Sequence, residues 1–422
     1  MSAENCHFDL IVCGGGMVGA SLVAALLPVA QQLQIRIALV EQNAIAVTAD
    51  PQYQPSFDAR STALAAGSRT LLEAMGVWAE LRRHLTPIDE IQVSARGQFG
   101  QTHMRADQEQ VPALGYVVEN HWMGQVLMSH ILRAQSDQIE LFSPAKVVSI
   151  TTAAAASTVR IEQAGGDLCS LQAPLIVMAD GGRSELRARM GIEYSEENYH
   201  QHALVANIGL DRPHRGVAYE RFTESGPIAL LPIESSAGIS RMGLVWTLAE
   251  NLFDEVQGLS DEAFLQRLQS AFGYRAGAFT RVGERFCYPL KRVLAEEQVR
   301  SGLVVLGNAA HALHPIAGQG FNLAIRGVAE LAEMIIERKQ RGLSLDDLSA
   351  LQRFADQRRK DQKRTINFGD ATLKLFMSSN PLLRLGRSVG LQTLDLLPPA
   401  KTLLARAAMG LDTSAPRLTL DE

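Results

Sequence analysis

The stretch Leu10-Ile11-Val12-Cys13-Gly14-Gly15-Gly16-Met17-Val18-Gly19 decides the fold, because an apolar run leads directly into a G-x-G-x-x-G motif. Residues 8–13 predict a buried strand, and the residues after the glycines predict a helix. In such a corner Gly14 permits the tight turn, Gly16 lets a pyrophosphate approach the backbone, and Gly19 lets the helix pack closely on the strand. The motif therefore predicts a Rossmann-like unit that binds a dinucleotide.

The next segments support this assignment. Residues 17–27 predict the helix, ending near Pro28, and residues 35–40 predict a second buried strand. Glu41 stands at the end of that strand, about 20 residues beyond the glycines, where a carboxylate binds the ribose and favours a free 2′-OH over a 2′-phosphate. One alternative stays open, in which the glycines form a turn that binds no ligand.

Two later segments repeat the pattern of a buried strand followed by a glycine turn. The strand expected at residues 175–179 leads into Asp180 and Gly181, which could also be plain turn formers. The strand expected at residues 303–306 leads into a longer glycine-rich loop and then a long helical pattern. The loop residues that matter here are Gly307, Asn308, Pro315, Gly318, Gly320, Phe321 and Asn322. Backbone N–H groups at such a helix start stabilise negative charge.

The composition limits the classes of protein to which this chain can belong. The 422 residues are 46% apolar, which is enough for a large core and two interleaved domains. A net charge of −5 argues against nucleic-acid binding. The four cysteines are widely spaced and form no C-x-x-C pair, so neither a structural metal site nor a disulfide framework is expected. With no secretory signal and no apolar stretch long enough to span a bilayer, we expect a cytoplasmic protein.

The order of the segments predicts the architecture. Residues 62–75 predict a helix, whereas residues 202–247 are apolar segments broken by turns, which is typical of an antiparallel sheet. The chain after residue 306 is mostly helical. We therefore expect an α/β (α+β) fold, in which a Rossmann-like domain carries an inserted antiparallel-sheet substrate domain and a helical C-terminus.

These motifs, in this order, resemble the group A flavoprotein monooxygenases, which share the fold of para-hydroxybenzoate hydroxylase. The resemblance covers essentially the whole chain and implies FAD as cofactor. It places the ADP half of FAD at Gly14, Gly16, Gly19 and Glu41, the pyrophosphate region at Asp180 and Gly181, and the ribityl chain and flavin at Gly307, Asn308, Gly318, Gly320, Phe321 and Asn322.

The resemblance also implies domain limits. The FAD-binding domain is expected at residues 1–80, 100–190 and 285–345, and the substrate sheet at residues 81–99 and 191–284. Residues 346–422 form the expected C-terminal helical region.

Three positions need comment. Asn308 stands where the family usually has Asp; an amide can still bond ribityl hydroxyls, without the charge. Arg60 matches an arginine that lies near the flavin and pyrophosphate, although a surface ion pair with Asp58 is an alternative. Asn120 falls where many members carry an arginine, and either contacts FAD or caps a helix.

Segments 58–64, 218–223, 226–232 and 314–323 are similar to the ubiquinone-biosynthesis hydroxylases, and Asn308 favours the branch typified by 2-octaprenyl-6-methoxyphenol hydroxylase. This implies hydroxylation of a polyprenylated phenol with NADH or NADPH and O₂, through a C4a-hydroperoxyflavin. Alternatives are another ring carbon, another aromatic substrate, or a weakly active flavin-binding scaffold in a quinone-biosynthesis assembly.

For the chemistry, N–H groups near Gly318 suit the negative charge that develops at the flavin N1–C2=O end. Pro315 could form part of a nonpolar wall that keeps water away from the flavin. The alternative is that it is an ordinary loop proline. No general base is identified: His311 and His314 lie in the flavin loop, whereas His202, Tyr219 and Arg221 lie in the sheet. Phe222, Leu230 and Trp246 are either a prenyl pocket or core.

Residues 351–410 are basic within an acidic chain. A basic amphipathic helix there contacts an anionic membrane surface or a partner, or simply covers the domain with solvated charges. The first interpretation suits a lipid-soluble phenol and a peripheral position at the inner membrane.

Overall fold

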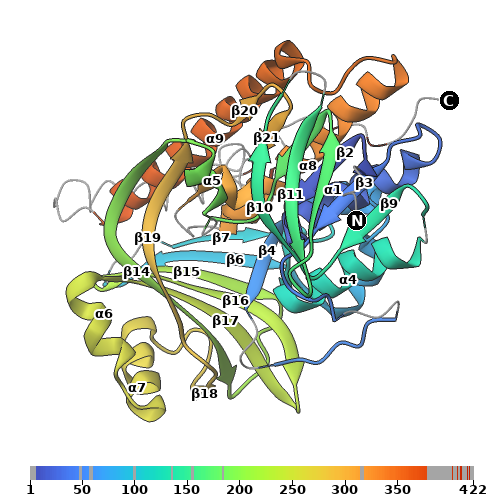
Figure 1. Cartoon of the computed structure of the whole chain (residues 1–422). Coiled ribbons are helices and arrows are strands. Elements are labelled where there is room, and N and C mark those ends of the chain that lie inside the picture. The colour runs from blue at the N-terminus through green and yellow to red at the C-terminus, as the bar shows by residue number, and fades with distance from the viewer. Residues whose placement is uncertain are drawn as a thin grey trace.

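The computed structural model describes residues 6–46, 50–56, 60–97, 101–134, 136–153, 156–182, 185–313 and 318–377, together with 402, 406, 409, 410, 416 and 418. Its main parts are a Rossmann-like domain and a large sheet that crosses beside it (Figure 1).

The Rossmann-like domain is built on a six-stranded sheet in the order β20-β21-β13-β2-β3-β9. Five of its strands are parallel: β2 (Leu10–Cys13), β3 (Ile37–Val40), β9 (Ile139–Phe142), β13 (Leu175–Met178) and β21 (Leu303–Val305). The short β20 (Val299–Arg300) is antiparallel. Strands β2, β3, β13 and β21 are apolar throughout because both faces of the sheet are covered.

Helices cover one face of this sheet and a second sheet covers the other. The helices are α1 (Met17–Ala30), α4 (Asn120–Arg133) and α8 (Gln319–Gln340). The four-stranded cover has the order β1-β12-β11-β10, formed by β1 (Cys6–His7), β10 (Ala145–Thr151), β11 (Ser157–Gln163) and β12 (Leu168–Ala173). A short helix, α5 (Leu186–Arg189), follows β13.

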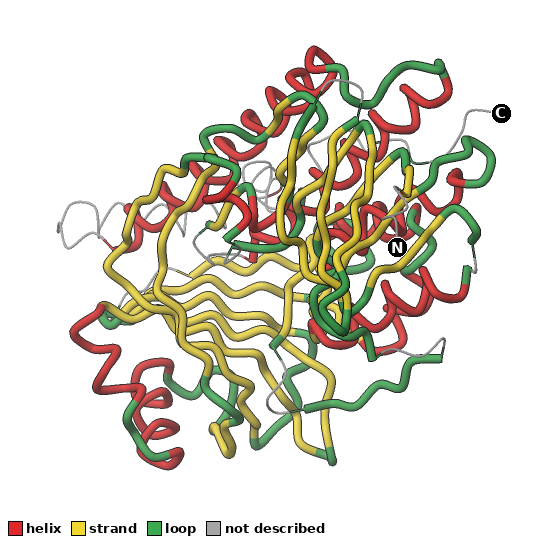
Figure 2. The backbone as a smooth tube through the Cα atoms, in the orientation of Figure 1, coloured by secondary structure: helices red, strands yellow, loops and turns green. Residues whose placement is uncertain are grey.

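The substrate sheet has nine strands, in the order β22-β19-β14-β17-β16-β15-β6-β7, with β18 paired to β14 (Figure 2). Its strands are β6 (Glu90–Ala95), β7 (Gln101–Arg105), β14 (Tyr194–Leu210), β15 (Val217–Thr223), β16 (Gly226–Ser236), β17 (Ile239–Ala249), β18 (Phe279–Val282), β19 (Phe286–Ala295) and β22 (His311–Ala312). It takes in β7 and β19, which lie beyond the expected limits of the substrate sheet at residues 99 and 284.

The two faces of this sheet have different neighbours, because side chains alternate along each strand. The outer face packs under α6 (Glu250–Gln257) and α7 (Asp261–Phe272), with Leu230 and Trp246 in that core. The inner face is turned toward the Rossmann-like domain. It carries Ala218, Glu220 and Phe222 on β15, Ala229, Leu231 and Ile233 on β16, and Arg241, Gly243 and Val245 on β17.

A three-stranded sheet in the order β4-β8-β5 joins the two parts. It consists of β4 (Ser61–Ala65), β8 (Gly115–Glu119) and β5 (Leu85–Ile88), with α2 (Ala66–Ala74), α3 (Trp78–Leu81) and the 3-10 turn η1 (Arg82–His84) beside it. The helix expected over residues 62–75 was wrong at its start. Thr62 to Ala65 form a strand because they pair with Val118 to Gly115 of β8.

Helix α1 also differs from expectation. It runs past Pro28 to Ala30, although proline has no N–H for the helix ladder. Leu26, Val29 and Ala30 are at most 3% exposed, and their burial in the core holds the last turn in place.

The C-terminal region begins with α9 (Leu348–Met377), which packs along α8. Beyond α9, the rest of the C-terminal helical region expected over residues 346–422 falls largely outside the described residues. No helix in the described ranges is long and apolar enough to cross a membrane.

Candidate active site

The first glycine loop leaves the start of α1 open. Gly16 is the N-cap residue, no side chain caps the helix, and a Cβ added at Gly16 would meet nothing within 4 Å. Gly14 has φ +109°, and a Cβ there would lie 2.6 Å from the carbonyl oxygen of Ala179. A Cβ on Gly19 would lie 1.9 Å from the Gly14 oxygen. The loop is thus tight where the chain packs and open where a pyrophosphate approaches the helix dipole.

The Glu41 carboxylate lies at the edge of this loop. Oε2 accepts a hydrogen bond of 2.8 Å from the N–H of Gly15. Oε1 accepts hydrogen bonds of 2.9 and 3.1 Å from the backbone and side chain of Asn43. The acidic group is therefore held beside the glycines, where a ribose is expected to bind.

The three glycine turns meet at the carboxyl ends of β2, β13 and β21. Besides the contact of Gly14 with Ala179 and Asp180, a Cβ on Gly182 would lie 3.2 Å from the carbonyl oxygen of Asn308. The turn η2 (Gly307–Ala309) begins with φ +63°, and a Cβ on Gly307 would lie 2.8 Å from the Val18 side chain. Asn308 is exposed between two buried neighbours. In open α/β sheets, ligands bind at this edge.

Helix α8 begins at the same place. Gly318 is its N-cap with φ +62°, no side chain caps the helix, and a Cβ on Gly320 would meet nothing within 4 Å. Phe321 packs against the domain core. The open N–H groups of this first turn are suited to hold negative charge.

The side chain of Asn322 is fully used within the protein. Its oxygen accepts hydrogen bonds of 2.8 Å from the N–H of Ala65 and from the Ser68 hydroxyl. Its amide nitrogen donates to the carbonyl oxygens of Ala63 and Gly318, at 2.9 and 2.8 Å. Asn322 therefore fixes the start of α8 against β4, and a cofactor can reach only its backbone.

Arg60 and Asn120 lie next to each other at the end of β8. The carbonyl oxygen of Arg60 accepts a 2.8 Å hydrogen bond from the N–H of Asn120. The Arg60 guanidinium donates to the Tyr288 hydroxyl at 3.0 Å and lies over the Phe286 ring. Asn120 accepts a 2.6 Å hydrogen bond from Thr62 and makes no cap bond for α4, so the capping alternative does not hold. Asp58 lies outside the described residues.

Of the other residues expected in the flavin loop, the structure describes only His311. Pro315 and His314 lie outside the described residues. His311 is buried, and its Nδ1 lies 3.4 Å from the amide nitrogen of Gln362 on α9. Burial lowers the pKa of His311 to about 4, so its ring is neutral near pH 7. Through its contact with Gln362, His311 attaches this loop to α9.

Except for Phe222, which lies on the inner face, the residues considered for substrate contact point away from the cofactor loops. Tyr219 lies edge-on to Phe272 of α7, and His202 stacks on Phe253 of α6 at 4.1 Å. Arg221 bonds Ser94 and lies over Phe272. Leu230 and Trp246, both fully buried, are core beneath the same helices, which decides against a prenyl pocket there.

Sequence reasoning missed the residue between Tyr219 and Arg221. Glu220 lies on the inner face, since neighbours along a strand face opposite ways. Burial raises the pKa of its carboxyl to about 7. Strand alternation was the signal that could have found it, once the covered face was known.

The ion pair between Arg241 and Glu119 on the inner face is structural. Arg241 and Glu119 are almost completely buried, with Nη2 of the arginine 2.9 Å from a carboxylate oxygen. Arg241 also donates to the carbonyl oxygens of Glu234 and Ser56. It ties the sheet to β8 and to the loop that leads to Arg60.

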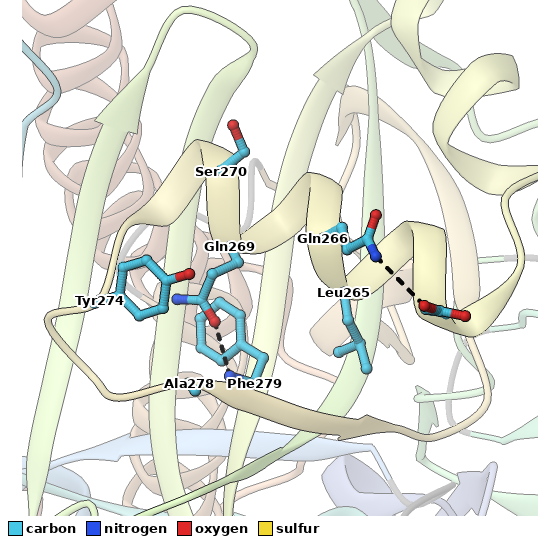
Figure 3. A pocket seen from close by; sticks show the side chains of 8 residues that line it. Leu265, Gln266, Gln269, Ser270, Tyr274, Ala278 and Phe279 are labelled. Carbon is cyan, nitrogen blue, oxygen red and sulfur yellow. Dashed lines mark hydrogen bonds between the residues drawn. The ribbon is translucent and has the colours of Figure 1, made fainter.

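A surface pocket of about 500 Å³ lies elsewhere, between α7 and β18 (Figure 3). Gln269 spans it and accepts a hydrogen bond from the N–H of Phe279, and Tyr274 lies at its edge. This pocket is across the substrate sheet from the glycine loops, so it has no part in the cofactor site.

The arrangement fits FAD. Two uncapped helix starts, at Gly16 and Gly318, flank three contacting glycine turns, with a carboxylate at one end and the inner face of the sheet at the other. Each open Cβ position leaves room for a ligand against bare backbone. The observed site can therefore hold an elongated dinucleotide and place its far end beside the substrate sheet.

Comparison with known proteins agrees with this geometry. The family model described as an FAD binding domain matches residues 7–359. The chain is 32% identical over 415 residues to ubiquinone hydroxylase UbiL of Rhodospirillum rubrum, which covers 97% of this chain and 92% of that protein. It is 28% identical over 433 residues to the mitochondrial ubiquinone biosynthesis monooxygenase COQ6 of Homo sapiens, covering 93% and 91%.

Among solved structures, p-nitrophenol 4-monooxygenase PnpA of Pseudomonas putida shares the fold. The TM-score is 0.76 at 18% identity, over 96% of this chain and 98% of that one. The family match spans the glycine turns and the whole substrate sheet. The chain therefore belongs to the FAD-binding domain family and is an FAD-dependent aromatic-ring monooxygenase that uses NAD(P)H and O₂.

Proposed function

We propose that the protein hydroxylates the ring of a polyprenylated phenol in ubiquinone biosynthesis, and that the step is 2-polyprenyl-6-methoxyphenol to the benzoquinol. The observation that carries the proposal is the meeting of the three glycine turns beside the largely apolar inner face. The likeness to UbiL and COQ6 along nearly their full lengths supports the ubiquinone pathway. Asn308 supports the choice of step, because this residue favours the branch typified by 2-octaprenyl-6-methoxyphenol hydroxylase.

In this proposal, different residues of the chain bind different parts of FAD. Gly14, Gly16 and Gly19 with Glu41 bind the ADP half, and Asp180 with Gly181 lies at the pyrophosphate. Gly307 and Asn308 bind the ribityl chain, and Arg60 lies at the junction with the substrate sheet. Bound FAD supplies the oxygen-transfer chemistry. The N–H groups at Gly318 to Phe321 stabilise negative charge at the flavin. The role proposed for Pro315, which lies outside the described residues, is to exclude water from the flavin.

A lipid-soluble substrate needs access from a membrane. Among the side chains of α9 that the structure describes, the exposed face is basic, with Arg353, Arg359, Lys360, Lys363 and Arg364 against one carboxylate, Asp356. Asp356 pairs with Arg359 at 2.9 Å, so basic side chains outnumber acidic ones on the exposed part of this helix that the structure describes. The proposal includes peripheral contact of this face with anionic lipid at the inner membrane, or with another enzyme of the pathway.

A scaffold with little activity is the second candidate, favoured by Asn308 alone. Two measurements separate the candidates. Oxygen consumption and NAD(P)H oxidation by the FAD-loaded protein should be stimulated by a prenylated phenol, with a product heavier by one oxygen atom. A scaffold shows no such stimulation.

The step is tested by mass spectrometry of quinone-pathway lipids in cells lacking the protein. Accumulation of 2-polyprenyl-6-methoxyphenol, reversed by the intact protein but not by Gly16→Val, supports the step. Accumulation of a different phenol moves the reaction to another ring carbon. Unchanged quinone levels refute a role in the pathway where no second hydroxylase is encoded.

A further inference from the structure

Glu220 occupies an unusual place on the inner face of the substrate sheet. Its cross-strand partners are Val93 on β6 and Ala229 on β16. The same line of residues continues through Val245 and Val205 on the next strands. A single carboxyl group therefore stands in an apolar row.

The surroundings leave this carboxyl without compensation. It forms no hydrogen bond or ion pair with any residue that the structure describes, and its side chain is half-buried. Burial alone accounts for its raised pKa, about 7, and no charged neighbour contributes. Buried carboxyls are normally paired, so an uncompensated one is expected to serve a ligand.

The inner face near Glu220 is connected to the flavin end of the cofactor site through β4. Ala63 contacts Gly318, and the N–H of Ala65 is bonded to Asn322 in the first turn of α8. The next residue, Ala66, packs into the same apolar cluster as Val93 and Leu231, which flank Glu220 on the inner face. The start of α8 is thus linked through β4 and Ala66 to the apolar cluster that lies beside Glu220.

Resting on the proposed function, we propose that Glu220 is the general base that takes the proton from the ring hydroxyl of the phenol substrate. The proton moves from the phenol oxygen to a Glu220 carboxylate oxygen, and the O–H electron pair stays on the substrate, making its ring a stronger nucleophile. When the hydroxylated ring carbon loses its hydrogen to water as a proton, Glu220 returns its own proton to the ring oxygen. The oxygen atom and electrons come from O₂ and NAD(P)H.

The neighbours make Glu220 the titrating group on this part of the sheet. The residues paired with it on β6 and β16 are Val93 and Ala229, and Ala66 of α2 packs against the same apolar cluster; none of these ionises. Thr102 on β7 is the partner of Val93 in the next strand, and Met409 belongs to the same apolar cluster; neither titrates near neutral pH. A general base works best when its pKa lies near the working pH, as it does here.

The test compares FAD-loaded wild type with Glu220→Gln and Glu220→Asp on a short-chain prenylated phenol, following product against pH. In wild type kcat should rise with pH through an apparent pKa near 7. Glu220→Gln should lose this rise and lower kcat by about 10² to 10⁴-fold, whereas KM changes little. Glu220→Asp should retain the rise. A fluorinated phenol, which ionises unaided, should restore much of the rate of Glu220→Gln.

Glu224→Gln is the matched control, because Glu224 is exposed in the turn of the same hairpin. It should keep the wild-type profile. FAD content and melting temperature confirm that each variant folds. An unchanged profile and rate in FAD-loaded Glu220→Gln overturn the inference and leave the proposed function intact. A wild-type protein that no phenol stimulates overturns the proposed function itself.

Discussion

The side-chain oxygen of Asn322 lies 2.8 Å from the backbone nitrogen of Ala65, and this bond joins the first turn of α8 to the strand that separates it from the substrate sheet. Asn322 is 1% exposed and satisfies four buried groups of the protein. Its place in a conspicuous glycine-rich loop suggests a ligand contact, but its side chain positions the loop.

Asn322→Ala should therefore destabilise the protein and loosen FAD together. Loss of the amide leaves buried polar groups unpaired, which costs about 2–4 kcal/mol in unfolding free energy. Chemical denaturation measures the stability, and fluorescence titration of the apoprotein measures FAD affinity. Ser68→Ala removes one of the four bonds and should have a smaller effect on both. Normal stability with lost FAD would show instead that the side chain contacts the cofactor.

Substitution at two glycines of the first loop should separate cofactor binding from folding. Gly16→Val places its side chain in open space, so the protein should fold with its normal melting temperature and yet fail to retain FAD. Gly19→Val must displace the backbone oxygen of Gly14 and should prevent folding. Absorbance of the purified proteins gives FAD content. A folded, fully yellow Gly16→Val protein would contradict the assigned pyrophosphate position.

Asn308→Asp should keep FAD bound. The side chain is exposed beside the backbone of Gly182, and both Asn and Asp offer an oxygen to a ribityl hydroxyl. Because charged hydrogen bonds are stronger, affinity should rise modestly, by up to about tenfold. Equilibrium dialysis against FAD measures the change. Loss of flavin would show that Asn308 does not face the ribityl chain.

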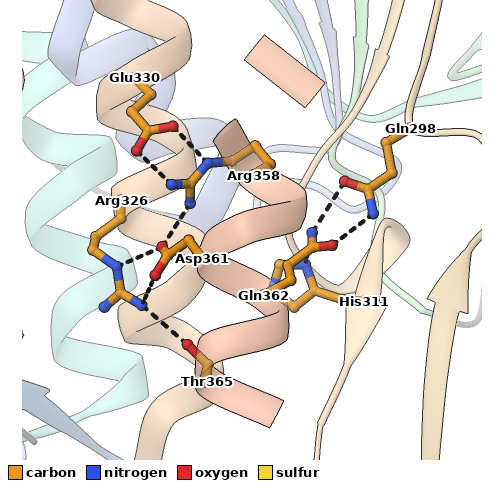
Figure 4. A network of polar contacts seen from close by, with 8 residues as sticks. All are labelled: Gln298, His311, Arg326, Glu330, Arg358, Asp361, Gln362 and Thr365. Atoms are coloured by element: carbon orange, nitrogen blue, oxygen red, sulfur yellow. Dashed lines mark hydrogen bonds and ion pairs between the residues drawn. The ribbon is translucent and has the colours of Figure 1, made fainter. Parts of the chain in front are cut away.

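The C-terminal helix is held by a buried ionic network (Figure 4). Arg358 of α9, 5% exposed, pairs with Glu330 of α8 and with Asp361, and Arg326 bonds Asp361 at 2.8 Å. Arg358→Met leaves two carboxylates partly unpaired and should cost about 3–5 kcal/mol. Arg359→Met, which breaks an exposed pair on the same helix, should cost under about 1 kcal/mol. Equal losses would mean that the network is solvated.

Structure that depends on neighbouring residues could be predicted from the sequence, whereas structure that depends on contacts between distant segments could not. The turn at Gly14 and the helix after it follow from local preferences and were found. Residues 62–65 were predicted as the start of a helix but belong to β4, because they pair with β8, which lies 50 or more residues later in the chain. Strand alternation set Glu220 apart from Tyr219 and Arg221. Which of them faces the cofactor is decided only when α6 and α7 cover the outer face.

The raised pKa of Glu220 also predicts how the unfolding free energy changes with pH, and this can be measured without substrate. Its pKa is about 7 in the folded protein against 4.5 for an ordinary glutamate. Below the lower value both states hold the proton and there is no penalty. As pH rises toward 7, the unfolded chain releases the proton while the folded protein keeps it, so folded-state stability falls. The total loss is about 3 kcal/mol, complete once pH exceeds the folded pKa.

Glutamine cannot ionise, so Glu220→Gln apoprotein should lack this loss. Its unfolding free energy relative to wild type should rise by the same amount between mildly acidic and mildly alkaline pH, measured by denaturant titration at each pH. The exposed control Glu224→Gln should follow wild type. Parallel curves for wild type and Glu220→Gln would show a solvated carboxyl. Such a carboxyl would have no raised pKa with which to serve as a base near neutral pH.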